Sequence, residues 1–509
     1  MTHFLTRRGF IATSVAAASA TALHPQLGLA QGTKVLRYGL SAFPPSFEMW
    51  ASTGAAAGAI KLMIHRGLVS YDPEGKLRGE LAESWEVDDD GKWTFKLRDA
   101  TWHDGTPVTA ADVKWTIEQT GADNSTAYRK AQMAAITHID TPDEKTVILT
   151  TAEPAATLPG WFGHYAMPIL KEGSETTSTN GAGPFKFVSQ ERGVKIIMEA
   201  NPDYYKEGEP ALDRIEAIVY SDENLRVAAL EAGDVDLIEY VPWPAMDRLE
   251  ADAGIKLDLV PGPFMYMVFN GTKAPFNNPL VRRAIGHAIK KDDVVAAAFY
   301  GHGAPLDHMP FDPSSPFYNE DLVDGWAYDP EKAKALLAEA GYPDGFSCTM
   351  LSTAQYGMHQ STAEVAQAYL SMIGVNVTLD LPDWSTRVQK GNAGEYDIAV
   401  MGTTADSNDP DGYTNVIDGA LAPAYVRSFG IETPKITEAL HKGRQSFDQA
   451  ERKAIYHEME KVCIEESPVV FLCSRAQGFA MKTSVTGYSN LPGQLTFYSG
   501  ITLEETDIG

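Results

Sequence analysis

Hydrophobic positions along the chain switch repeatedly between a helical and a strand spacing. Residues 330–340 repeat apolar side chains at helical spacing after Asp329-Pro330, a cap followed by proline at the first helical position. Residues 375–381 alternate apolar and polar side chains, which predicts a half-buried strand. Asn278-Pro279 predicts the start of another helix with one apolar face. Helices and strands in alternation predict an α/β fold.

Two segments have the sequence of a helix-capping box. Thr109 to Asp112 precedes the apolar residues of one predicted helix. Ser361 to Glu364 has the same pattern before an apolar stripe that ends at Gly374. Each box predicts a helix that begins at its hydroxyl residue.

The first thirty residues have the pattern of an export signal. Arg7 and Arg8 precede Phe10 and an alanine-rich apolar run, which ends at the small residues 28–30. The paired arginines resemble the twin-arginine type, which exports folded proteins. The alternative is a disordered basic N-terminus. We expect a signal peptide over residues 1–30 and a mature protein outside the cytoplasm.

Length and charge limit the classes of function. Removing residues 1–30 from the 509 would leave 479, which exceeds one hydrophobic core and predicts two or more lobes. The net charge is −26, and −28 without the two signal arginines. So acidic a chain is repelled by nucleic acid and by anionic lipid, so neither is an expected partner.

Motifs for catalysis and for metals are incomplete. His457-Glu458 is followed by Lys461 where a zinc helix needs its second histidine, and residues 406–412 lack the spacing of a calcium loop. Neither a nucleophile elbow nor a phosphate-binding loop is present. We therefore expect no enzyme, no cofactor and no metal site. Cys463 and Cys473 could form a disulfide or be buried as apolar residues.

Several longer segments resemble one family. They are residues 79–113, which include Trp102-His103-Asp104-Gly105-Thr106-Pro107, and the shorter stretches 181–185, 230–236, 269–285 and 328–333. Together they resemble the extracellular solute-binding proteins of family 5, which bind peptides, opines or nickel for ABC importers.

The resemblance implies an α/β, two-lobed periplasmic-binding-protein (clamshell) fold with an extra subdomain inserted in the first lobe. Lobe I would comprise residues 32–269 and 477–509, with the inserted subdomain at about 71–190, and lobe II residues 270–476. Such a protein closes around a solute and performs no chemistry. The implied protein is a periplasmic monomer, and its partners are the solute and the permease subunits in the inner membrane.

The resemblance also implies ligand-binding residues. Asp406 corresponds to an aspartate that grips the ligand's amino group, because a carboxylate in a closed cleft pairs well with an ammonium. Trp384 corresponds to an aromatic residue beside the ligand, and Tyr413, Phe43 and Phe47 are further candidates. Loop capping for Asp406 and core packing for the aromatic residues are the alternatives.

One departure from the family concerns the ligand's carboxylate. Dipeptide binders have an arginine where this chain has His359-Gln360-Ser361. Arg387 or Arg427 could replace it, although nothing in the sequence shows that either points inward. A longer peptide, an opine, a conjugated amino acid or a basic solute would fit better than a dipeptide, and a metal chelate fits least. A secreted hydrolase, or a receptor or chaperone with the same fold, are the other classes considered.

Overall fold

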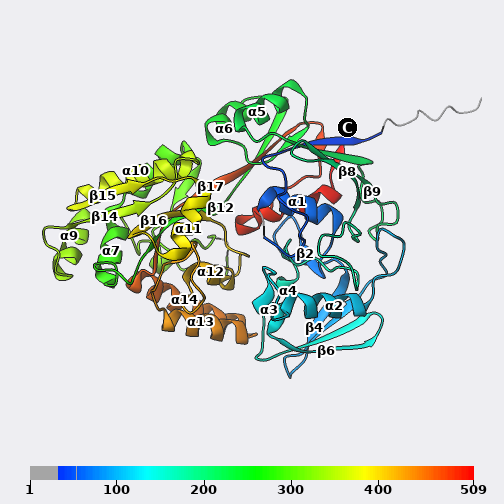
Figure 1. Cartoon of the computed structure of the whole chain (residues 1–509), viewed down its shortest axis with the longest axis horizontal. Helices are drawn as coiled ribbons and strands as arrows, with labels where there is room; N and C mark the ends of the chain where they lie inside the picture. The colour runs from blue at the N-terminus through cyan, green and yellow to red at the C-terminus, as the bar shows by residue number, and fades with distance from the viewer. Residues whose placement is uncertain (1–32, 53, 314) are drawn as a thin grey trace, which may run out of the picture. The chain divides into compact units, whose positions relative to one another are not determined.

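The chain is built on one large mixed sheet, seen in a computed structural model that describes residues 33–509 except 53 and 314 (Figure 1). The predicted twin-arginine signal lies outside the described residues. Residues 34–509 form a single compact unit. In this described part, no helix combines the length and the apolar character needed to cross a membrane.

The large sheet contains two groups of parallel strands joined by a long antiparallel pair. Its strands, in spatial order, are β15 (Val375–Asp380), β14 (Phe346–Leu351), β16 (Ile398–Thr403), β12 (Ile255–Phe269), β17 (Val469–Lys482), β11 (Leu237–Ile238), β1 (Val35–Leu40), β10 (Arg214–Val219), β9 (Lys195–Ala200) and β8 (Phe185–Glu191). A short strand, β13 (Gly303–Pro305), also pairs with β17. Strand β14 is parallel to β15 and β16, and β1 is parallel to β10 and β11.

Strands β12 and β17 connect the two groups. They pair along almost their whole length, and the register shifts between Pro261 and Phe264, opposite Ser474 to Ala476. On one side of this irregularity, residues between 264 and 473 bury one large apolar cluster. On the other side, residues from 36 to 237 pack with residues 479–503 in a separate cluster. The two clusters are the cores of a two-lobed α/β fold.

A second, four-stranded antiparallel sheet has a core of its own. Its order is β4 (Ala82–Val87), β5 (Trp93–Leu97), β7 (Thr146–Thr151) and β6 (Ile136–Asp143). Helix α2 (Ala110–Gly121) begins with the predicted capping box, because both the Thr109 and the Asp112 side chains are bonded as that motif requires. The sheet falls inside the predicted insertion at 71–190, whose bounds stay a prediction.

Helices cover the sheets. They are α1 (Ala55–Ile64), α3 (Lys130–Ala134), α4 (Leu158–Trp161), α5 (Glu223–Ala232), α6 (Trp243–Glu250), α7 (Pro279–Ala288), α8 (Lys291–Phe299), α9 (Pro330–Glu339), α10 (Gly357–Ser371), α11 (Trp384–Ala393), α12 (Thr414–Ile417), α13 (Pro434–Gln445) and α14 (Gln449–Glu466), with a 3-10 helix η3 (Gly493–Glu504) near the C-terminus.

Most local predictions are confirmed, and one is wrong. Helix α9 begins after Asp329, helix α7 after Asn278, and β15 occupies the predicted strand. The capping box predicted at Ser361 is wrong, because α10 already begins at Gly357. Glu364 instead accepts a hydrogen bond from the Gln360 side chain, one turn earlier in the same helix. Cys463 and Cys473 do not form a disulfide. Like Cys348, they are free and buried.

A buried ionic cluster ties η3 to the N-terminal part of the chain. The Glu504 carboxylate is fully buried and accepts hydrogen bonds from Arg66 (2.8 Å), Arg78 (2.5 Å) and Lys206 (2.6 Å). Glu80, also fully buried, is shared by the same three cations. Burial opposes ionisation of Glu504, but the three cations outweigh it and lower its pKa to about 2. The cluster therefore depends on the charge of Glu504.

Replacing Glu504 by glutamine should lower the free energy of unfolding by about 3–5 kcal/mol, because buried cations lose their counter-charge. The folded-state pKa of Glu504 lies below its unfolded value, so its contribution is complete above pH 4.5 and is lost as pH falls toward 2. Chemical denaturation across that range measures both effects.

Glu505→Gln is the matched control. Glu505 lies next in sequence and bonds Arg78 at 2.5 Å, but its side chain is 27% exposed, so about 1 kcal/mol or less should be lost. Equal destabilisation by the two variants would contradict the role given to the buried cluster.

Candidate functional site

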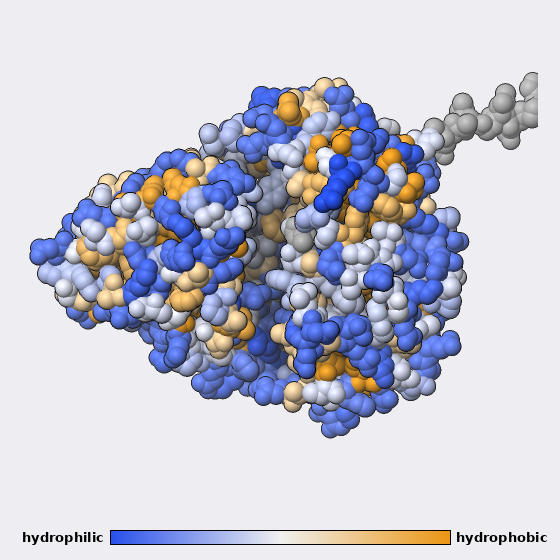
Figure 2. Space-filling view, in the orientation of Figure 1, coloured by the Kyte–Doolittle hydropathy of each residue, from blue (hydrophilic) through white to orange (hydrophobic). Residues whose placement is uncertain are grey.

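A groove separates the surface over α11 and α12 from the surface over α1 (Figure 2). The loop after β16 lies next to this region and is held from the other end of the chain. Gln494 of η3 accepts hydrogen bonds from the Thr404 hydroxyl (2.8 Å) and the Ala405 amide (2.9 Å). The Tyr498 hydroxyl donates to the Asp406 carbonyl at 2.9 Å. The loop that carries Asp406 is therefore fixed by contacts with η3.

The Asp406 carboxylate bonds residues that are distant in sequence. It accepts from the Tyr128 hydroxyl (2.8 Å) and the Asn415 amide (3.1 Å), and the Arg129 guanidinium lies 3.3 Å away. Burial lowers the pKa of Arg129, but the charge of Asp406 and the neighbouring tyrosine hydroxyls together raise it overall. Burial and the same carboxylate raise the pKa of Tyr128. Asp406 is thus the acceptor at the centre of a polar cluster.

Other polar contacts join the region of the four-stranded sheet to α13 and to the loop after β16. The Ala156 amide donates to the Arg444 carbonyl at 2.7 Å, and the Thr157 hydroxyl donates to Asp411 at 3.3 Å. The Gln445 amide donates to Glu153 at 2.7 Å. Together with the Asp406 cluster, these bonds connect residues 128–157 to residues 406–445.

Trp384 begins α11 and is the centre of an aromatic cluster. Its ring contacts Tyr356, His359 and Tyr425, with centroids 5.3, 5.6 and 6.1 Å away. Tyr356 is 41% exposed, and Trp384 and Tyr425 are half-buried. The cluster therefore offers ring surfaces that a planar or apolar group can contact.

Arg387 and Arg427, the two candidate arginines, differ in their bonding. Arg387 is 1% exposed, and its guanidinium lies 4.7 Å from the Trp384 ring centre. It donates to the Val400 carbonyl at 2.5 Å, and its Nε has no partner. Burial lowers its pKa to about 10. Arg427 instead donates to the carbonyls of Asn415 and Ala422 in its own neighbourhood.

The other three candidates pack against apolar residues. Tyr413 is 1% exposed, stacks on Phe264 at 5.8 Å, and donates to the Pro310 carbonyl at 2.6 Å. Phe43 and Phe47 are half-buried against the cluster around β1, and Phe47 meets Phe187 edge-on at 5.5 Å. The roles predicted for these residues in ligand binding stay predictions.

The sequence did not predict Tyr128, Arg129 and Arg475 as residues of this region, nor the packing of His359 against Trp384. Tyr128 and Arg129 precede a five-residue helix, with no motif around them. Arg475 lies inside β17, where its neighbours are buried. One signal in the sequence points to Arg475: it is the single arginine in a hydrophobic strand, and a buried charge needs a partner.

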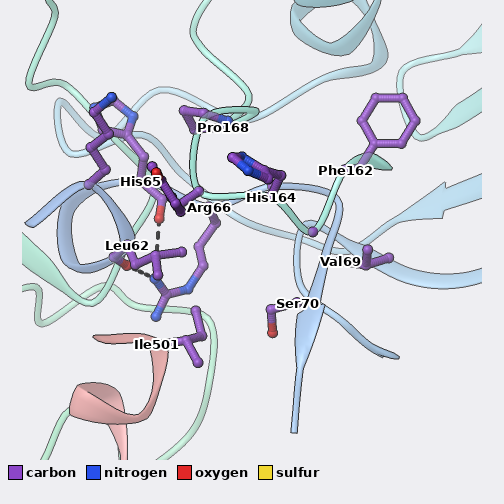
Figure 3. A pocket seen from close by; sticks show the side chains of 13 residues that line it. Leu62, His65, Arg66, Val69, Ser70, Phe162, His164, Pro168 and Ile501 are labelled. Atoms are coloured by element: carbon purple, nitrogen blue, oxygen red, sulfur yellow. Dashed lines mark hydrogen bonds between the residues drawn. The ribbon is translucent and has the colours of Figure 1, made fainter. Parts of the chain in front are cut away.

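One enclosed cavity lies elsewhere, between α1 and the segment 162–168 (Figure 3). Arg66 borders it and donates to the carbonyls of Leu62 and His65. The cavity volume of about 10 Å³ accommodates at most one water molecule, so it cannot hold a solute. In residues 33–509, apart from the two positions left undescribed, no three His, Cys, Asp or Glu side chains are grouped to hold a metal ion.

The arrangement is suited to binding. The Asp406 carboxylate lies in the loop after β16, the Tyr128 hydroxyl bonds it from the segment before α3, and the Trp384 ring and the Arg387 guanidinium lie on α11. Such a combination fixes the orientation of a small polar solute.

Comparison with known proteins finds relatives that are solute-binding proteins. Residues 76–421 match the model of the bacterial extracellular solute-binding proteins, family 5. Glutathione-binding protein GsiB of Pectobacterium atrosepticum is 27% identical over 479 residues, which cover 90% of this chain and 92% of GsiB. GsiB of Escherichia coli K12 is 27% identical over the full length of both chains.

Solved structures agree with this fold. The periplasmic binding protein AgaA of A. tumefaciens R10, in complex with agropinic acid, is 39% identical with a TM-score of 0.85, covering 93% of this chain and 99% of AgaA. DppA of Helicobacter pylori, in complex with the peptide STSA, is 25% identical with a TM-score of 0.79, covering 93% and 98%. Because the family model matches most of the chain, this protein belongs to the extracellular solute-binding proteins of family 5, the substrate-binding proteins of ABC importers.

Proposed function

We propose that this protein closes its two lobes around one amine-bearing, opine-like or peptide-like solute in the periplasm and delivers it to an ABC permease in the inner membrane. The observation that carries the proposal is the 39% identity with AgaA over 93% of the chain. The relatives bind agropinic acid, glutathione or peptides, which favours small solutes with several polar groups.

Asp406 is proposed as the anchor for the solute's amine. A carboxylate has about four acceptor positions, and Tyr128, Arg129 and Asn415 use three of them. One position therefore remains for a ligand ammonium. The Asp406 side chain is 17% exposed, so a solute in the groove can reach it.

The polar contacts between residues 128–157 and 406–445 support closure as the working motion. Few bonds join these regions, and each is individually weak in water, so a solute that adds contacts to both sides can shift the population toward the closed state. The register irregularity in the β12–β17 pair, near Pro261 and Ala476, is the proposed hinge. The protein is proposed to act as a monomer and not as an enzyme; peptide products after incubation would favour the secreted hydrolase.

Agropinic acid, reduced glutathione and the peptide STSA are the first solutes to test. A solute that binds only the folded, closed protein should stabilise it by about 2.7 kcal/mol at a hundredfold excess over its Kd. Thermal melts measure that shift, and small-angle scattering should show compaction with the same solute. A panel that changes neither the melt nor the radius would count against the proposed function.

Asp406→Asn should lower the affinity for an amine-bearing solute tens- to thousands-fold, because the ammonium loses its counter-charge. Arg129→Met is the matched variant on the other side of the ion pair, and it should weaken binding far less. Calorimetric titration of both single variants and of the double variant gives their coupling.

The alternative is that Asp406 acts only by bonding Arg129 in the closed state. That role requires that the two single variants lose the same amount of affinity for the solute and that the double variant loses no more than either of them. Melts without solute provide the control: both single variants break the Arg129–Asp406 pair, so a ligand anchor predicts a similar change in the empty protein's stability for the two but a larger loss of affinity for Asp406→Asn.

Export by the twin-arginine route is the last part of the proposal. Replacing Arg7 and Arg8 by lysine keeps the charge and removes the paired guanidinium groups, so the precursor should accumulate in the cytoplasm. Cell fractionation and immunoblotting measure it. Normal delivery of the lysine variant to the periplasm would favour the general secretory route.

A further inference from the structure

Two buried arginines in the described chain lack an acidic partner and also have an Nε buried without a hydrogen bond. Arg387 is 1% exposed and Arg475 2% exposed. Among the described residues, no carboxylate lies within salt-bridge distance of either, and the Nε of each has no hydrogen-bond partner. A buried, incompletely bonded charge costs free energy, so each arginine calls for a partner that a ligand can supply.

Arg282 shows how this protein satisfies a structural arginine. It is also buried and also lacks an acid, but its Nε, Nη1 and Nη2 donate to the carbonyls of Ser467, Phe276 and Glu466. The bonds of Arg387 to protein oxygen reach one carbonyl only, that of Val400, from Nη2. A buried arginine of this protein can thus bond all its nitrogens to carbonyls, and Arg387 does not.

Arg475 lies on β17 beside the register irregularity. Its guanidinium lies 5.9 Å from the Tyr240 ring centre and 5.6 Å from that of Trp243, and its Nη1 donates to Gln477 at 3.2 Å. Tyr240 has a φ of 51°, an uncommon backbone conformation for a bulky residue. Backbone strain of this kind concentrates at ligand-binding and hinge positions.

His359 links the two arginines. Its ring is buried, contacts Trp384 and has an unpartnered Nδ1. Burial, together with the charges of Arg387 and Arg475, lowers its pKa to about 3. Gly402 of β16 lies beside the His359 ring and pairs with Met265 of β12. Met265 in turn pairs with Cys473, two residues before Arg475. Both guanidinium groups therefore lie near one imidazole, which is neutral at physiological pH.

We infer that Arg387 and Arg475, with His359 beside them, form the receptor for a carboxylate group of the transported solute. A guanidinium presents paired N–H donors that match the two oxygens of a carboxylate. The half-buried rings of Trp384 and Tyr425 would then contact the part of the solute next to the carboxylate. This inference rests on the proposed function and specifies the chemistry of one end of the solute.

The test compares acids with their amides. Agropinic acid, reduced glutathione and the peptide STSA are each titrated against derivatives whose carboxylates have been converted to carboxamides, which keep the shape and remove the charge. Wild-type protein should bind at least one acid about thirtyfold or more tightly than its amide. This measurement needs no variant, so it is independent of folding defects.

The variants then assign the preference to residues. Arg387→Met and Arg475→Met should each reduce the acid-to-amide affinity ratio about tenfold or more, and the double variant should bring it close to one. Arg282→Met is the matched control and should leave the ratio unchanged. Each variant is first melted without solute to verify that it is folded.

The outcomes separate the inference from the proposed function. If an acid and its amide bind equally tightly, or if the double variant keeps the preference, the carboxylate receptor is wrong while solute binding stands. If no compound binds, both are overturned. A preference for the acid that is lost in the arginine variants and kept in Arg282→Met supports the inference.

Discussion

The pairing of β12 with β17 is the constraint on which the rest of the structure depends. Strand β17 carries residues of both buried cores, and β12 carries residues of the core between 264 and 473 and, at Ile255, of a further apolar cluster, so the cores are attached to the same hydrogen-bonded ladder. A register slip by one residue would turn every side chain to the opposite face of the sheet, and because β17 and residues 262–269 of β12 are buried almost throughout, it would disturb the packing on both faces. The pairing is irregular between Pro261 and Phe264 and again between Met265 and Tyr266, and Arg475 is on the strand opposite the first irregularity. The proposed hinge and one arginine of the proposed carboxylate receptor therefore lie at the same place in the ladder.

Two kinds of buried charge have different consequences. In the cluster of Glu504 and Glu80, three cations meet two carboxylates, and nearly every polar atom has a partner within the protein. That cluster holds η3 against the N-terminal chain and needs no ligand. At Arg387 and Arg475, cations are buried with aromatic rings and carbonyls but without acids. In the first cluster the cost of burying the charges is offset by ion pairs within the protein. At the two arginines no acid of the protein offsets that cost.

Local sequence patterns predicted the elements well because they depend on neighbours in the chain. Asp329, Asn278 and Thr109 cap helices through bonds to residues two or three positions away. Ser361 failed because the apolar spacing continues upstream to Gly357, so the helix incorporates the apparent cap. The resemblance to family 5 predicted Asp406 and Trp384 as site residues, but not their partners. Tyr128 and Asp406 are 278 positions apart, and no local pattern can reveal such a contact.

The strongly acidic surface does not prevent the binding of an anion. At physiological ionic strength the field of an exposed charge falls off over about 8 Å, so carboxylates scattered on the surface act weakly inside a groove. Two guanidinium groups in a desolvated site act at short range, where screening by salt is much weaker. Selection between a carboxylate and its neutral analogue therefore depends on a few buried groups, whereas the net charge of −26 acts on solubility and on the exclusion of nucleic acid and anionic membranes. In the proposed carboxylate receptor, an arginine on α11 and one on β17 take the role of the arginine that dipeptide binders have at the position of His359.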